Sequence, residues 1–130
     1  MMMRRTLAIT AILLGLNTAA HADILAAGGM YGGPTQVVAA CYLFNAGTGS
    51  VNVLSNQIFR EQQNLPALNL PLATDQCGAL APNSICVIAA NIGNATHACK
   101  FVVSPSAADV RGGFEVRAAG GVVLKNVDLR

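Results

Sequence analysis

The chain has 130 residues, of which 53% are hydrophobic, with eight basic and six acidic side chains. Arg4 and Arg5 account for the whole excess of positive charge, because the remaining residues carry six basic and six acidic groups. Without a basic patch in that remainder, binding to nucleic acid or to an anionic membrane surface is not expected.

The N-terminal segment has the features of a removable export signal. The two arginines precede an apolar run over residues 7–16, and Ala20-His21-Ala22 fits the small-x-small site after which signal peptidase cuts. The run is about half the roughly twenty residues that cross a bilayer, so no retained membrane anchor is expected. We therefore expect residues 1–22 to be removed, and the remainder suffices for one domain.

Strand patterns dominate the first half of the mature region. Residues 23–34 are rich in glycine and alanine, and we expect them to form a flexible lead. Residues 35–44 form a nearly continuous apolar run, which is typical of a strand buried on both faces. Turn-forming residues at 45–50 then separate it from a second strand predicted over 51–59.

A segment rich in leucine and proline follows. Because proline cannot donate to a central ladder, Pro66 and Pro71 predict an edge strand or a connecting loop. Its leucines could form an exposed apolar surface for a partner, but packing of a loop on the core is the favoured interpretation. The candidate partner-binding residues here are Leu65, Leu68, Leu70 and Leu72.

The C-terminal half continues with strands. Residues 85–92 and 97–103 predict buried strands, and Phe114 to Arg117 alternates between apolar and charged residues as a half-buried strand does. Ala119-Gly120-Gly121 predicts a tight hairpin into a last strand over 122–129. That strand could add to a partner's sheet, although pairing within its own hairpin is the favoured interpretation. Its candidate partner-binding residues are Val123, Lys125 and Val127.

Short strands separated by turns, without a long amphipathic helix, predict an all-β fold. We expect an immunoglobulin-like antiparallel β-sandwich of about seven to eight strands over residues 35–130, stabilised by two disulfides. An even number of cysteines in a short exported domain supports this, although four cysteines allow three pairings and spacing alone does not choose among them. The cysteines are Cys41, Cys77, Cys86 and Cys99.

The context of the cysteines favours one pairing. Cys41 lies in the first buried strand and Cys99 in a late one, each on an apolar face. In an immunoglobulin-like sandwich such strands are B and F, which a disulfide commonly joins. Cys77 and Cys86 would then close a small loop.

Three blocks of the sequence resemble Hydin-like immunoglobulin-fold domains: residues 45–53, residues 77–88 (CGALAPNSICVI), and Ser104-Pro105 together with residues 111–116. The resemblance covers about residues 37–117. It implies a seven-stranded sandwich, related in architecture to major sperm protein and the periplasmic pilus chaperones, with a non-enzymatic scaffolding or adhesion role. Cys41, Cys99 and the last strand lie outside the family pattern.

Metal, cofactor and enzyme sites are not expected. Zinc ligands come in close pairs such as C-x2-C, and these cysteines are further apart. A serine, His97 and Asp109 could on paper form a nucleophile, base and orienter, but no G-x-S-x-G motif supports it. A structural histidine near the disulfide is the favoured interpretation of His97.

The function predicted from the sequence is therefore a non-catalytic binding or scaffolding module, exported to the bacterial periplasm or the extracellular space. Its partner is an unidentified protein or envelope component, and oligomers are possible. The first alternative is a subunit of a pilus-like surface fibre that assembles by strand exchange. The second is a small exported hydrolase.

Overall fold

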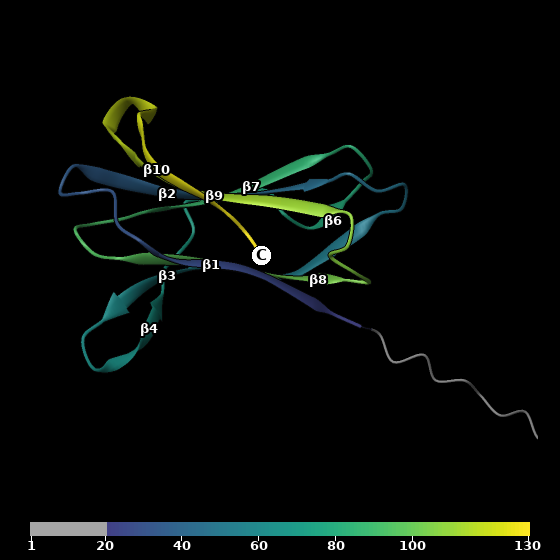
Figure 1. Cartoon of the computed structure of the whole chain (residues 1–130), viewed down its shortest axis with the longest axis horizontal. Helices are drawn as coiled ribbons and strands as arrows, with labels where there is room; N and C mark the ends of the chain where they lie inside the picture. Colours follow the sequence, from purple (N-terminus) through teal and green to yellow (C-terminus); the bar gives the residue numbers. More distant parts are fainter. Residues whose placement is uncertain (1–20) are drawn as a thin grey trace, which may run out of the picture.

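The computed structural model describes residues 21–130 (Figure 1). The predicted export signal therefore lies outside the described residues, except for its last two positions. The strands are β1 (Asp23–Met30), β2 (Gln36–Asn45), β3 (Val51–Gln62), β4 (Leu65–Asn69), β5 (Thr74–Asp75), β6 (Ala79–Leu80), β7 (Ile85–Asn91), β8 (His97–Ser104), β9 (Val110–Ala118) and β10 (Val123–Asp128), with a 3-10 turn, η1 (Ala119–Gly121), before the last.

The strands form two antiparallel sheets that pack face to face (Figure 1). Sheet A has the order β1-β8-β3-β4, with β6 also paired to β3, and sheet B has the order β10-β9-β2-β7-β5. This arrangement confirms the predicted all-β sandwich, in which eight strands are longer than two residues. Within residues 21–130, no helix is long and apolar enough to cross a membrane.

The alternating sequence pattern of the strands sets which side chains enter the core. In β8, His97, Cys99, Phe101 and Val103 are at most 1% exposed, whereas the residues between them are half-buried on the outer side. In β9, Phe114 enters the core in the same way. The two inner faces thus meet in a single apolar core, as the sequence pattern predicted.

The expected flexible lead is wrong for its first eight residues, which form β1. This strand pairs with the edge of β8, and Leu25 and Met30 are buried against the core. The composition of small residues suggested disorder, but two apolar anchors and a complementary neighbouring strand outweigh that weak local preference.

The arrangement of the strands is related to the immunoglobulin order with two differences. As B and E do, β2 and β7 lie together in one sheet, and β3 and β8 lie together in the other as C and F do. The strand beside β8, where immunoglobulin domains have G, is β1 from the opposite end of the chain. Beside β2, where immunoglobulin domains have strand A, this chain has β9.

Both predicted disulfides are present. Cys41 on β2 is joined to Cys99 on β8 with 6.5 Å between Cα atoms, so the bond links the two sheets through the core. Cys77 is joined to Cys86 at the start of β7, with a Cα separation of 5.1 Å. The two bonds are consistent with an oxidising, exported environment.

The two disulfides should contribute unequally to stability. In the chain-entropy account a bond stabilises more as the loop it closes lengthens, which gives about 4 kcal/mol for the 58-residue separation and about 2.7 kcal/mol for the separation of nine. We expect a Cys41→Ala/Cys99→Ala variant to lose more free energy of unfolding than Cys77→Ala/Cys86→Ala. Urea denaturation of both variants measures the two losses. A larger loss in Cys77→Ala/Cys86→Ala would contradict the assignment of the Cys41–Cys99 bond as the more stabilising one.

Candidate functional site

The structure separates the four leucines of the predicted partner surface into an exposed pair and a half-buried pair. Leu65 and Leu68 lie on the edge strand β4 and are 65% and 42% exposed. Leu70 and Leu72 follow β4 and pack, half-buried, against the core. The prediction of an edge strand is confirmed, but the four leucines do not form one continuous surface.

The other predicted partner surface lies on β10, whose pairing with β9 confirms the hairpin. Val123, Lys125 and Val127 are exposed along this edge strand. The register shifts between Val123 and Lys125, and an irregular edge strand that carries a lysine discourages the addition of a further strand. Strand β10 is an edge strand of sheet B and contacts β1, an edge strand of sheet A. Strand β4 is at the other edge of sheet A, beyond β3, so the two predicted surfaces lie at opposite edges of the sandwich.

His97 is placed where it cannot work as a base with Asp109. Its ring is 1% exposed in the core, and neither ring nitrogen has a hydrogen-bond partner within the described part of the chain. His97 begins β8, whereas Asp109 lies in the loop after the other end of that strand. The structural interpretation of His97 is therefore the one that fits its position.

The described residues also show how the cysteines are used. All four are in disulfides, so none is free to ligate a metal. Residues 21–130 contain no group of three histidine, cysteine, aspartate or glutamate residues that could hold a metal ion.

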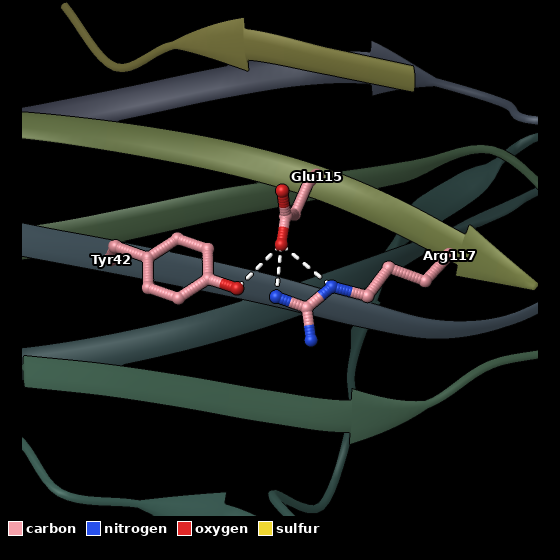
Figure 2. Close-up of polar contacts among 3 residues, drawn as sticks. All are labelled: Tyr42, Glu115 and Arg117. Atoms are coloured by element: carbon pink, nitrogen blue, oxygen red, sulfur yellow. Dashed lines mark hydrogen bonds and ion pairs between the residues drawn. The ribbon is translucent and has the colours of Figure 1, made fainter. Parts of the chain in front are cut away.

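A polar cluster missing from the sequence predictions lies on the outer side of sheet B. Tyr42 is on the central strand β2, opposite Gly113 of β9, and Glu115 and Arg117 follow on the same outward face of β9. Figure 2 shows Tyr42 and Arg117 approaching the Glu115 carboxylate from different sides. The pairing register of two strands thus brings together residues that are more than seventy positions apart in the chain.

One carboxylate oxygen holds this cluster together. Oε1 of Glu115 accepts hydrogen bonds from the Tyr42 hydroxyl at 2.5 Å, from Nε of Arg117 at 2.6 Å, and from Nη2 of Arg117. The Arg117 guanidinium also lies 5.6 Å from the centroid of the Tyr42 ring, within the range of a cation–π contact. The three side chains therefore hold one another in a fixed geometry.

The cluster is partly screened from water. The Glu115 side chain is 17% exposed and that of Arg117 30%. Burial raises the pKa of the Glu115 carboxyl above its ordinary value, whereas the hydrogen bonds from Tyr42 and Arg117 favour its charged form. Figure 2 shows the second carboxylate oxygen and one guanidinium nitrogen without contacts among the residues drawn, so an acceptor and a donor point away from the cluster.

The missing side chain of Gly113 leaves hollows on either side of Tyr42. One, of about 270 Å³, is lined by Phe44, Ile85 and Arg111, and the other, of about 220 Å³, by Glu115, Asn126 and Asp128. Ile85 is 69% exposed, the highest value among the large apolar side chains of the described region. We name this surface the Tyr42 face, defined by Tyr42, Phe44, Ile85, Arg111, Gly113, Glu115 and Arg117.

The sequence contained a signal for part of this face. Glu115 and Arg117 are two positions apart in an alternating strand, and this spacing places their side chains on the same face and allows an ion pair. The contribution of Tyr42 depends on the register between β2 and β9, which no local pattern reveals. Its position inside an apolar run instead suggested burial.

Another hollow, of about 570 Å³, lies at the end of the sandwich where β3 meets the loop between β7 and β8. Its lining is polar and includes Arg60, Glu61 and Asn94. Asn94 accepts a hydrogen bond from the Tyr31 hydroxyl at 2.6 Å, and Glu61 accepts one from the amide of Thr96. The second contact joins the loop to β3, and the first joins it to the connection between β1 and β2.

No family model, no curated protein and no solved structure matches this chain. The resemblance to Hydin-like domains therefore stays a prediction.

The burial of His97 gives a prediction about pH. Burial lowers the pKa of His97 from its ordinary value of 6.5, with a smaller contribution from the Arg60 charge, and it outweighs the opposite effects of the Ala95 backbone and the Glu61 charge. The unfolded chain takes up a proton near pH 6.5 that the folded chain resists, so the free energy of unfolding should fall as the pH drops through 6.5 toward the folded-state pKa.

Urea denaturation between about pH 7.5 and pH 5.5 measures this loss, because the unperturbed histidine titrates within that window. In His97→Leu the same loss should be smaller, since leucine has no proton to bind and leaves no unpaired buried nitrogen. Both proteins share every carboxylate, so the difference between them isolates His97. Equal losses in the two proteins would show that His97 makes no contribution.

Proposed function

We propose that this chain is an exported, non-catalytic binding or scaffolding module that contacts a protein partner through the Tyr42 face. The observation that carries the proposal is the exposed Ile85 side chain beside the ordered Tyr42–Glu115–Arg117 cluster. Tyrosine and arginine are enriched where protein interfaces gain most of their affinity, and an apolar centre with a polar surround is the usual form of such interfaces.

The proposed compartment is the periplasm or the extracellular space of a bacterium. The two disulfides and the export signal predicted from the sequence support an oxidising compartment. The resemblance to Hydin-like domains supports a scaffolding or adhesion role rather than catalysis.

The chemistry of the face indicates what a partner should present. An apolar side chain could enter the hollow beside Phe44 and Ile85, where it would be removed from water. A polar group next to it could bond the exposed groups of Glu115 and Arg117. A partner with an apolar residue beside a polar or charged one would satisfy both requirements.

Site-specific crosslinking in the native envelope tests the proposal. A photoreactive amino acid at position 85 should capture a defined partner, whereas the same group at Leu54 should not. Leu54 is a matched control because it is 60% exposed but lies on β3 of the opposite sheet. Equal capture from both positions would contradict the assignment of the face.

A second variant separates contact from folding. A Cβ added at Gly113 would meet only the backbone oxygen of Val127, at 4.0 Å, so Gly113→Val should preserve the fold while it fills the hollow. We expect capture from position 85 to fall about tenfold, which corresponds to a loss of about 1.4 kcal/mol in binding. Undiminished capture by a folded Gly113→Val protein would show that the hollow is not used.

A further inference from the structure

The first strand is held mainly by one neighbouring strand, β8. It lies at the edge of sheet A, and among its eight residues only Leu25 and Met30 are buried. Apart from its ladder with β8, two hydrogen bonds join Ala26 to Arg130, and the Asp23 carboxylate accepts a third from the amide of Ala107. An edge strand with two apolar anchors can detach at a lower free energy than the central strands.

The connection from β1 to β2 has the features of a hinge. It consists of five residues, 31–35, that pass from sheet A to sheet B. Gly33 has a φ of +103°, which L side chains rarely adopt, and a Cβ there would meet no atom within 4 Å. The turn thus requires a backbone conformation at Gly33 that other residues rarely adopt, while Tyr31 and Gly32 hold its first part through hydrogen bonds to Asn94 and Gln36.

Departure of β1 would open a gap that only a similar strand can fill. The inward side chains of β8, including Phe101 and Cys99, would lose part of their cover, and one edge of β8 would lose its backbone partners. A strand that replaces β1 must carry apolar residues where Leu25 and Met30 lie. A second copy of this chain supplies that strand with the same register.

The other free edges are less suited to strand addition. Pro66 interrupts β4, and β10 combines an irregular register with the charge of Lys125. The edge of β8 already accepts a strand with apolar anchors, β1, although the register of that ladder also shifts between Ala27 and Met30. Exchange at β8 also replaces the ladder contacts that it removes, and exchange of an identical element is therefore a low-cost route to a dimer.

We propose that two copies of this chain exchange β1, so that β1 of each copy pairs with β8 of the other in a dimer. This inference goes beyond the proposed function and does not depend on it, since β1 belongs to sheet A and the Tyr42 face is on the outer side of sheet B. It also differs from the sequence predictions, in which the last strand was a candidate for addition to a partner's sheet and the fibre alternative named no strand for exchange.

A pair of introduced cysteines can report where β1 is paired. Ile24 lies opposite Val102 in the β1–β8 ladder, and a disulfide between directly opposite positions is geometrically reasonable. In Ile24→Cys/Val102→Cys, the added bond forms within one chain if β1 pairs with β8 of its own chain. It forms between two chains if β1 is exchanged. Non-reducing gels and peptide mapping of the chain from Asp23 to Arg130, after concentration and size-exclusion separation, distinguish the two.

We expect the dimer fraction to contain the bond between chains. The matched control is Ser55→Cys/Val102→Cys, because Ser55 faces the same Val102 from β3, which is not exchanged. That bond should always form within one chain. A monomer at every concentration, or a dimer in which the added bond between positions 24 and 102 lies within single chains, overturns the proposal.

A hinge variant gives an independent test. Gly33→Ala should strain the tight turn of the monomer but not an extended linker, and it should raise the dimer fraction at least about fivefold at the same concentration. The control is Gly49→Ala, since Gly49 also has open space around it but no positive φ. An unchanged dimer fraction in a folded Gly33→Ala protein counts against exchange, whatever partner the Tyr42 face captures.

Discussion

The covalent link between the central strands of the two sheets is the constraint on which the structure depends. Cys41 lies on β2 and Cys99 on β8, and each strand has a neighbour on both sides within its own sheet. The bond between these two strands fixes how one sheet lies on the other. The remaining strands then add to β2 and β8 by backbone pairing within their own sheets. In a chain with few aromatic residues and no tryptophan, this bond lies among fully buried apolar side chains, of which Phe101 and Phe114 are the largest.

The same two strands also determine what the outside of sheet B presents. Strand β2 places Cys41 in the core and the next residue, Tyr42, on the opposite side, because successive side chains alternate between the faces. Gly113 lies across from Tyr42 and provides no side chain, and a hollow borders the tyrosine on each side of this pair. Cys41, which links the two sheets, and Tyr42, which belongs to the candidate binding face, are therefore consecutive residues of β2.

The fold could be predicted because period-two alternation and turn residues are local signals, as in Phe114 to Arg117 and in β8. The disulfide pairing came from the immunoglobulin-like placement of the strands that carry Cys41 and Cys99. The first strand was missed because its alanines and glycines gain strand conformation only from the edge of β8. The Tyr42 face was missed because register, not pattern, brings Tyr42 to Glu115. His97 and Asp109 looked compatible in the sequence because one-dimensional distance does not show that a whole strand separates them.

The small ring closed by Cys77 and Cys86 has a kinetic consequence. The disulfide joins a turn-rich segment to the first residues of β7, and Cys86 is the direct neighbour of Ile85. The backbone at Ile85 is therefore ordered before a partner binds. Binding through such a preorganised residue avoids the entropic cost of fixing a loop. Association at that point would then resemble the docking of two rigid bodies, with the lifetime of the complex, rather than its rate of formation, setting the affinity.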